Sequence, residues 1–415
     1  MTSIPEKGRP WPAIKGDLDA AKAHDFSWRD GRMAVYYYFL DDDLMRVQQE
    51  AYTSYWIENG LGQRAFPSLK KLEDDVLGMG LDLLKAPPGG AASFTSGGSE
   101  SIFLAMLAAR NWAREEKGID RPTAVLPRTA HPTFDRAAHY LGVKVIRVPT
   151  TRNDFRADVA AIERALTPET VMIVGSAPNY PFGVFDPIVD LGALAQRRGL
   201  WLHVDACVGG FIAPWARRIG YDIPPFELDV PGVSSMSADL HKYGMTAKGA
   251  SMLLLADGSR KRFHSFEFEN WERGKYAAVT TQGSRPGGAV AAAWAVLNYL
   301  GADGYMRCAK LVMDTKARLV AGIEAIPGLE VLQPHDLCIF VYRSADPDLD
   351  IAAVADAMGR RGWLIGRQSE PPGIHLALNP NHEVMVEPYL RDLREAVAEA
   401  RGTVADAKAA TERTY

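Results

Sequence analysis

The residues that indicate chemistry most clearly form the segment Ser-Ala-Asp-Leu-His-Lys-Tyr-Gly at 237–244. Earlier in the chain, an apolar run ends in His-Val-Asp-Ala at 203–206, which places Asp205 at the end of an expected strand. Lys242 has an amine that can form a Schiff base with an aldehyde. Asp205 can keep a pyridine nitrogen protonated, because a neighbouring carboxylate favours the charged form. A protonated pyridine ring accepts electrons from a carbanion on a bound substrate. In this order, the two residues predict pyridoxal 5'-phosphate as cofactor.

Either residue alone has a plainer interpretation, since most lysines are solvated and an aspartate after a strand is usually a helix cap. The segment Thr-Ser-Gly-Gly-Ser-Glu-Ser at 95–101 adds a phosphate site, because it precedes an apolar helical stretch at 102–109. Gly98 and Ser99 would offer backbone N–H groups and a hydroxyl to a phosphate at the start of that helix. A glycine turn with a serine cap explains the segment equally well. Neither GxGxxG nor GKS/T occurs there, so no Rossmann or Walker site is predicted.

Three further segments are candidates for contact with the cofactor or substrate. His131 follows an expected strand, where its ring could stack on the pyridine and take part in proton transfer, although a lone histidine is more often structural. The loop Ala-Pro-Asn-Tyr-Pro-Phe-Gly at 177–183 could present Asn179 or Tyr180. The loop Gly-Ser-Arg-Pro-Gly-Gly at 283–288 leads into a helix and could contact an anion, including one across a subunit boundary.

With these motifs in this order, the chain resembles the sphingosine-1-phosphate lyase group of pyridoxal phosphate enzymes, which is related to the group II amino-acid decarboxylases. The resemblance covers roughly 30–300 and is carried by the segments 95–101, 130–135 (Ala-His-Pro-Thr-Phe-Asp), 203–211 (His-Val-Asp-Ala-Cys-Val-Gly-Gly-Phe), 237–244 and 283–288. It implies the aspartate aminotransferase fold (fold type I) and a homodimer with active sites at the subunit interface.

The resemblance also implies roles at matching positions. Lys242 becomes the Schiff-base lysine, Asp205 the partner of the ring nitrogen, and His131 the residue that stacks on the ring. The cofactor phosphate would be bound by Gly98, Ser99 and His241, and by Ser284 of the neighbouring subunit. Residues implied to face the phosphate of the substrate are Lys248, Tyr180 and one of the tyrosines at 36–38, with Tyr36 and Tyr38 as the candidates.

Two positions depart from the pattern of these lyases. Gly62 and Phe182 stand where the lyases usually or often have a histidine, which weakens the case for sphingosine phosphate itself as substrate. The eukaryotic members carry a membrane anchor, and we expect none here.

Alternating strand and helix patterns through the middle of the chain predict an α/β fold with a mostly parallel sheet and helices on both faces. The expected strands are 123–126, 143–148, 171–174, 200–204, 232–236 and 251–255, with helices at 158–166 and 188–198. Helices at 287–300 and 305–326 should follow. A smaller α+β unit should then contain strands at 329–332, 337–342 and 373–378, with helices at 351–361 and 384–400. We expect an N-terminal segment (1–60), a large cofactor-binding domain (61–302) and a small C-terminal domain (303–415), whose end frays from Val404.

Composition agrees with a cytoplasmic protein. The 415 residues are 47% hydrophobic and 24% charged, with a net charge of −4 that gives no reason to expect a nucleic acid partner. Three cysteines without CxxC spacing indicate reduced thiols and no metal site, and the N-terminus lacks the apolar region of a signal peptide. No apolar run reaches the ~18 residues of a membrane span.

The sequence therefore predicts a pyridoxal phosphate carbon–carbon lyase that cleaves a phosphorylated β-hydroxy amine. The alternative is α-decarboxylation of an L-amino acid, which uses the same lysine and the same ring. A non-catalytic protein that binds the cofactor would not need Asp205 together with Lys242, and a nicotinamide oxidoreductase would need a fingerprint that is absent.

Overall fold

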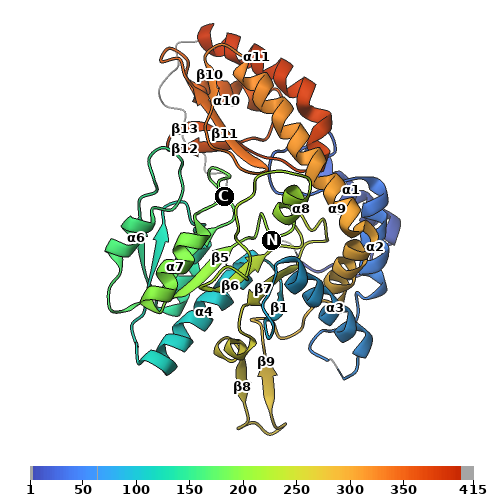
Figure 1. Cartoon of the computed structure of the whole chain (residues 1–415). Helices are drawn as coiled ribbons and strands as arrows, with labels where there is room; N and C mark the ends of the chain where they lie inside the picture. Colours follow the sequence, from blue (N-terminus) through green and yellow to red (C-terminus); the bar gives the residue numbers. More distant parts are fainter. Residues whose placement is uncertain (1–2, 63, 403–415) are drawn as a thin grey trace.

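The computed structural model describes residues 3–62 and 64–402, and its main element is a seven-stranded sheet (Figure 1). The strand order is β1-β7-β6-β5-β4-β2-β3; β7 is antiparallel to both of its neighbours and the other pairs are parallel. The strands are β1 (Ala91–Thr95), β2 (Thr123–Pro127), β3 (Lys144–Val148), β4 (Thr170–Ser176), β5 (Trp201–Asp205), β6 (Val233–Ala238) and β7 (Ser251–Leu255). The predicted mostly parallel sheet is confirmed.

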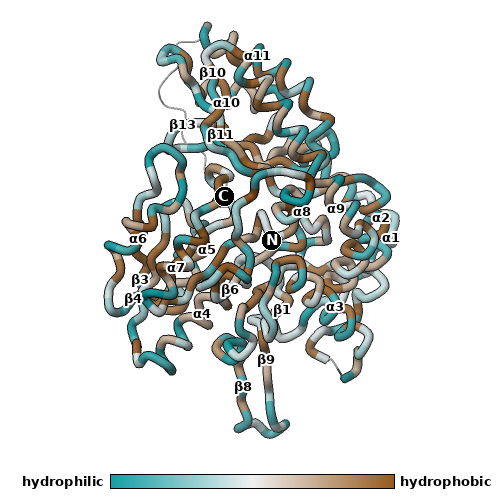
Figure 2. The backbone as a smooth tube through the Cα atoms, viewed as in Figure 1, coloured by the Kyte–Doolittle hydropathy of each residue, from teal (hydrophilic) through white to brown (hydrophobic). Residues whose placement is uncertain are grey.

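Helices cover both faces of this sheet, because successive strand residues point to opposite sides. Leu126 and Trp201 belong to the hydrophobic cluster with α4 (Gly98–Lys117) and α5 (Thr133–Leu141). Val125 and Leu202 belong to the cluster on the other face, with α6 (Val159–Ala165), α7 (Ile188–Arg198), α8 (Ala213–Arg218) and α9 (Gly287–Glu324). Figure 2 shows hydrophobic positions gathered along the strands and inner helix faces, with hydrophilic positions along outer segments.

The C-terminal part forms a second, antiparallel sheet in the order β10-β11-β13-β12. Its elements are β10 (Leu329–Val331), β11 (Ile339–Ser344), α10 (Ile351–Arg360), β12 (Gly366–Ser369), β13 (Pro372–Ala377), η3 (Pro380–Met385) and α11 (Val386–Gly402). The two helices expected at 287–300 and 305–326 join into α9, with a kink at Gly301 (φ 56°, ψ −176°), a conformation that suits glycine. The kink lies close to the expected domain boundary at residue 303, and that boundary stays a prediction. The tail from Val404 lies outside the described residues.

The N-terminal segment connects the two parts of the molecule. Its helices are α1 (Trp11–Ala21), η1 (Lys22–His24) and α2 (Asp42–Ser54). α2 packs on α9, as does α3 (Pro67–Leu83), the first helix after the segment. Between η1 and α2, the backbone N–H of Ala34 donates to Leu364 O (3.0 Å) in the C-terminal part. Nε2 of His382 lies 2.8 Å from Met33 O. These contacts fix the segment that carries the tyrosines at 36–38.

A short hairpin of β8 (Phe266–Phe268) and β9 (Tyr276–Ala278) follows the 3-10 helix η2 (Gly258–Phe263) and projects from the body of the molecule (Figure 1). Within the described residues, no helix combines the length and the hydropathy that crossing a membrane requires.

Candidate active site

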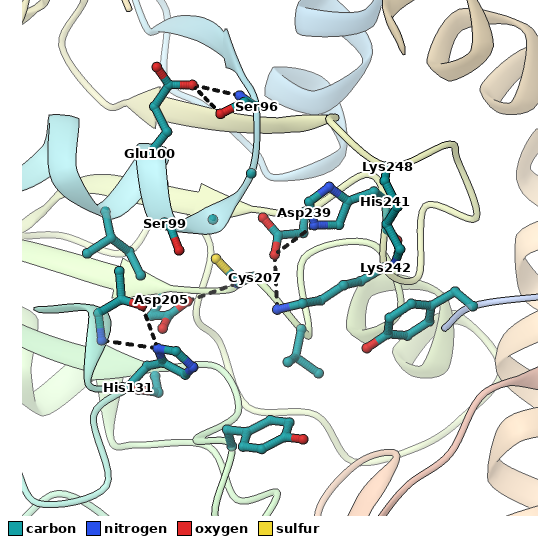
Figure 3. A pocket seen from close by; sticks show the side chains of 18 of the residues that line it. Ser96, Ser99, Glu100, His131, Asp205, Cys207, Asp239, His241, Lys242 and Lys248 are labelled. Carbon is teal, nitrogen blue, oxygen red and sulfur yellow. Dashed lines mark hydrogen bonds and ion pairs between the residues drawn. The ribbon is translucent and has the colours of Figure 1, made fainter. Parts of the chain in front are cut away.

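A cavity of about 430 Å³ opens at the carboxyl ends of the central strands, where parallel sheets bind ligands (Figure 3). β5 ends at Asp205, and the loop after β6 brings Asp239, His241 and Lys242 to the same place. The cavity brings together ten of the eleven residues to which the resemblance assigns a role, which are Tyr36, Tyr38, Gly98, Ser99, His131, Tyr180, Asp205, His241, Lys242 and Lys248. The eleventh, Ser284, is not part of its lining. Asn179, the other candidate in the loop of Tyr180, is buried outside this lining.

Lys242 lies opposite a buried carboxylate to which the sequence analysis assigns no role. Its Nζ is 3.0 Å from Oδ2 of Asp239, and Asp239 is 3% exposed. Burial disfavours the ammonium, but the acidic groups around it, Asp239 foremost and Asp205 among them, together outweigh burial and raise the pKa of Lys242 well above its ordinary value. The ion pair therefore holds Lys242 charged at the cavity wall, and its amine must lose a proton before it can attack an aldehyde.

The start of α4 supplies a site for a phosphate. The first N–H groups of a helix have no partner within it, and the helix dipole favours an anion there. A Cβ at Gly98 would lie 2.6 Å from Cys207 Sγ and 2.9 Å from the oxygens of Asp239, so only glycine lets α4 approach this closely. Ser99 is exposed at the same terminus. Nδ1 of His241 accepts from Ala250 N (3.3 Å), so the proton of the neutral ring is on Nε2, which lies 3.7 Å from Asp239 Oδ2.

This arrangement fits an aldehyde that carries a phosphate. The helix terminus, the hydroxyl of Ser99 and the Nε2 of His241 can bind the phosphate. Lys242, once deprotonated, can form the Schiff base with the aldehyde. Asp239 Oδ1 is buried and has no hydrogen-bond partner among the described residues, so this side of the cavity has unused polar capacity.

Asp205 is held by two donors at the base of the cavity. Its Oδ1 accepts from Cys207 N (3.1 Å) and from Ser237 Oγ (3.3 Å). These bonds orient the carboxylate toward the space that a pyridine ring would fill. Burial, reinforced by the Asp205 charge, raises the pKa of the Cys207 thiol well above its ordinary value, so Cys207 stays protonated and is no nucleophile.

His131 is neutral and fixed by its neighbour two residues later. Its Nδ1 accepts from Thr133 N (3.2 Å) and lies 2.9 Å from Thr133 Oγ1. Burial lowers the pKa of His131, against the attraction of Asp205. The ring of Tyr180 meets it edge to face, with centroids 6.5 Å apart. A neutral, oriented imidazole beside Asp205 (Figure 3) supports the proposed stacking role.

A second cation, Lys248, lies at the edge of the cavity. Its Nζ lies 5.1 Å from the centroid of the Tyr38 ring and donates to His241 O (3.3 Å). Partial removal from water, together with repulsion by Lys242, lowers the pKa of Lys248 to about 8, although the residue keeps an exposed side. Tyr36 and Tyr38 both face the cavity. Tyr37, between them, turns away and its hydroxyl accepts from Asn381 Nδ2 (3.2 Å).

Ser284 lies outside the lining of this cavity, in contact with Asn59. Its hydroxyl accepts from Asn59 Nδ2 (3.0 Å), and the next residue, Arg285, forms a buried bidentate pair with Glu73 (2.7 and 2.9 Å). Gly62 lies in the turn that includes Asn59, so it also lies away from the cavity of its own chain. The expected contribution of Ser284 to a neighbouring subunit stays a prediction.

Phe182 does not line the cavity either. It is 7% exposed and stacks on Phe155, with centroids 4.0 Å apart, in a small cluster with Leu332 and Val341 of the C-terminal part. The absence of a histidine at 182 therefore reflects apolar packing between the two parts of the chain and removes no polar group from the cavity of this chain.

Glu100 is a further residue that the sequence analysis does not assign. Its carboxylate accepts from Ser96 N (2.7 Å), Ser96 Oγ (2.8 Å) and Thr281 N (2.8 Å), and also from the Thr281 hydroxyl. It thereby joins the phosphate segment to the loop that carries Ser284. Glu100 stands three residues after Gly97, in the first turn of a helix, where an acidic residue is common. Nothing in the sequence therefore predicts its contact with Thr281.

Comparison with known proteins shows which families and structures the chain is similar to. Residues 2–343 match the pyridoxal-dependent decarboxylase conserved domain. The chain is 38% identical to a sphingosine-1-phosphate lyase of Oryza sativa over 95% of this chain and 74% of that protein. It is 32% identical to a "Probable L-tyrosine/L-aspartate decarboxylase" of Methanothermobacter thermautotrophicus over 81% of this chain and 91% of that protein. The solved structure of a Burkholderia pseudomallei sphingosine-1-phosphate lyase superposes with a TM-score of 0.93 at 36% identity, covering 97% and 94% of the two chains.

Proposed function

Because the chain belongs to the pyridoxal-dependent decarboxylase family and is a pyridoxal phosphate-dependent lyase of fold type I, we propose that it cleaves a carbon–carbon bond in a phosphorylated β-hydroxy amine. The products are an aldehyde and a phosphoethanolamine-like amine. The relatives of 38% and 36% identity that carry the name sphingosine-1-phosphate lyase support this reaction over the alternative.

The observation that carries the proposal is the presence of two lysines with separate surroundings in one cavity. The charge of Lys242 is balanced by Asp239 at 3.0 Å, and its amine would form the Schiff base with the cofactor aldehyde. Lys248 lies beside Tyr38 and contacts no carboxylate within 4 Å among the described residues, so its charge is available to an anionic group of the substrate. A phosphate at the end of the substrate amine suits this position.

When bound, pyridoxal phosphate supplies an electron sink for the bond that breaks. The residues of the chain then decide which bond that is, because it must stand perpendicular to the ring. Lys248, Tyr38 and Tyr180 hold the anionic end of the substrate and so fix its rotation about the Cα carbon. Asp205 would keep the ring nitrogen protonated, and neutral His131 would cover one face of the ring. Lys242 would take the proton of the β-hydroxyl as a free amine and, as the ammonium paired with Asp239, would return it to the Cα carbon.

A second cavity of about 230 Å³ adjoins the first and suits the part of the substrate that leaves as aldehyde. The two cavities share Tyr36, His131 and Tyr180. Val35, Pro132 and Pro181 give the second cavity apolar walls, while Arg128 and Arg367 line its edge. An apolar chain beyond the β-carbon would lie here. A series of phosphorylated amino alcohols of increasing chain length tests this, and kcat/KM independent of chain length would contradict it.

We also place the active enzyme in a homodimer in the cytoplasm. The contact between Asn59 and the exposed Ser284 supports the dimer, since a residue implied to bind the phosphate does not line the cavity of its own chain. All three cysteines are buried and unpaired, which is typical of a reducing compartment.

The decisive experiment offers the holoenzyme phosphorylated β-hydroxy amines and L-amino acids in parallel, and measures both aldehyde and carbon dioxide. We expect aldehyde without carbon dioxide from the phosphorylated amines. The decarboxylase alternative has support from the relative of 32% identity. Carbon dioxide from L-tyrosine, L-aspartate or another amino acid, with no aldehyde from any phosphorylated amine, would establish it instead.

A further inference from the structure

A line of buried polar side chains runs beneath the cavity along β5 and β6. On β5 the positions are Trp201, His203 and Asp205, two residues apart and therefore on one face. On β6 they are Ser235 and Ser237, which pair in register with His203 and Asp205. Trp201, His203, Ser235 and Ser237 are all fully buried. Buried polar groups are costly unless they are hydrogen-bonded, so the partners of each atom can be followed one by one.

Four hydrogen bonds connect these side chains into one chain. Trp201 Nε1 donates to Ser235 Oγ (2.7 Å). Ser235 Oγ lies 2.8 Å from His203 Nδ1, and His203 Nε2 lies 3.2 Å from Ser237 Oγ. Ser237 Oγ donates to Asp205 Oδ1 (3.3 Å). The line therefore starts at an indole and ends at the carboxylate proposed to hold the ring nitrogen of the cofactor.

The direction of every bond follows from its two ends. An ionised carboxylate only accepts, so the proton of Ser237 must point to Asp205 and its oxygen must accept from His203. His203 then carries its proton on Nε2, and its bare Nδ1 accepts from Ser235. The oxygen of Ser235 is left to accept from Trp201, whose indole can only donate. Burial lowers the pKa of His203 to about 4, so the ring has a single proton to place.

We propose that Trp201, Ser235, His203 and Ser237 are positioning residues that act through this one-way chain to present Asp205 to the cofactor as an oriented, ionised acceptor. The thiol of Cys207 donates to Ser237 Oγ (3.3 Å) and is consistent with the same direction. Reversing the chain would turn the Ser237 proton toward His203 and take that donor away from Asp205, which would keep the bond from Cys207 N. The proposal rests on the assignment of Asp205 to the ring nitrogen, and it does not depend on which substrate is cleaved.

Neutron diffraction from crystals of the deuterated holoenzyme tests the direction without any substitution. We expect deuterium on Nε2 of His203, with the Ser235 deuteron directed at Nδ1 and the Ser237 deuteron at Asp205. Deuterium on Nδ1 of His203, or on both nitrogens, would overturn the proposal.

A pair of variants tests the consequence. Ser237→Ala removes the donor to Asp205, whereas Thr123→Val removes a hydroxyl that is also buried in the same sheet (7% exposed, against 0% for Ser237) and lies 3.0 Å from the hydroxyl of Thr170. We expect Ser237→Ala to retain the cofactor and to lose about tenfold or more in turnover, which is the scale of one hydrogen bond to an ionised group. In its absorption spectrum, the ring nitrogen should lose its proton at a lower pH than in the wild type. Thr123→Val should change neither quantity. Identical pH spectra for the two variants would refute the proposal. If neutron diffraction shows the expected deuterium positions but Ser237→Ala leaves the pH spectrum unchanged, the assignment of Asp205 to the ring nitrogen is wrong.

Discussion

The pH dependence of substrate binding offers a sharp test of the role of Lys248. Its pKa of about 8 lies close to working pH, because partial burial and the charge of Lys242 both disfavour the ammonium. An ammonium binds a phosphate below its pKa and loses that attraction above it. The KM for a phosphorylated substrate should therefore be low near pH 7, and should rise as pH increases through 8.

The size of the rise follows from the charged fraction of Lys248. Above its pKa, that fraction falls about tenfold for each pH unit. KM stops rising once Lys248 is uncharged and the other groups of the site alone bind the substrate. A hydrogen bond to a charged group contributes about 1.5–3 kcal/mol, or about 10- to 100-fold in affinity, so the ceiling should lie in that range. The second pKa of a phosphate is about 6, so the substrate keeps its dianionic charge throughout.

Two substitutions separate Lys248 from other groups that titrate nearby. Lys248→Arg keeps a cation that stays charged above pH 12, so its KM should remain nearly flat from pH 7 to about 9.5. Lys248→Gln should show a high KM at every pH, with the absorption of the bound cofactor unchanged. A KM that rises equally with pH in the wild type and in Lys248→Arg would assign the titration to another group and refute the reasoning.

Four further outcomes are expected. Lys242→Ala should abolish turnover together with the borohydride-reducible bond to the cofactor; a remaining reducible bond would implicate Lys248. Asp205→Asn should keep the cofactor but cut turnover by orders of magnitude, since an amide cannot stabilise the protonated ring nitrogen, and near-normal kcat would mean that another acid faces it. Mixing Lys242→Ala with Ser284→Ala subunits should restore activity by complementation, whereas a fully active monomer in sedimentation would exclude the shared site. Asp239→Asn should let the cofactor-free protein bond pyridoxal at lower pH than the wild type, as followed by absorbance, because the carboxylate that keeps Lys242 protonated is gone; an unchanged pH midpoint would contradict this.

The main sheet could be predicted because its strands are short runs of apolar and β-branched residues between helical patterns. β2 to β7 follow this pattern and lie within about a residue or two of the expected ranges. β1 was missed because Ala-Ala-Ser-Phe-Thr contains few strand-forming apolar residues, and its burial comes from pairing with β7. β8 and β9 have three residues each, and every residue of β8 is exposed, so no alternation of buried and exposed positions marks them.

The residues expected to contact the cofactor lie in local motifs, and they were selected from those motifs and from the family resemblance that the motifs carry; their contacts with the cofactor stay a prediction. The contacts that fix those motifs are different, because they join residues far apart in the sequence. Glu100 meets Thr281 across 181 positions, and Arg285 meets Glu73 across 212. Nothing in the sequence near Glu100 or Glu73 distinguishes either acid from a solvated one. Asp239 is an intermediate case, since its spacing of three from Lys242 is visible but only burial makes the pair significant.

The line from Trp201 to Asp205 shows where local spacing stops being informative. The pattern Trp-x-His-x-Asp on β5 and the pattern Ser-x-Ser on β6 can each be read from the sequence. Their meaning depends on register, and β5 and β6 shift register between Leu202 and His203. A slip of one residue would turn Ser235 and Ser237 to the opposite face and leave His203 buried without partners. The sheet therefore does more than bring Asp205 to the cavity. Its register selects which polar side chains hydrogen-bond behind that carboxylate, and in the proposed mechanism these side chains orient Asp205 for the cofactor.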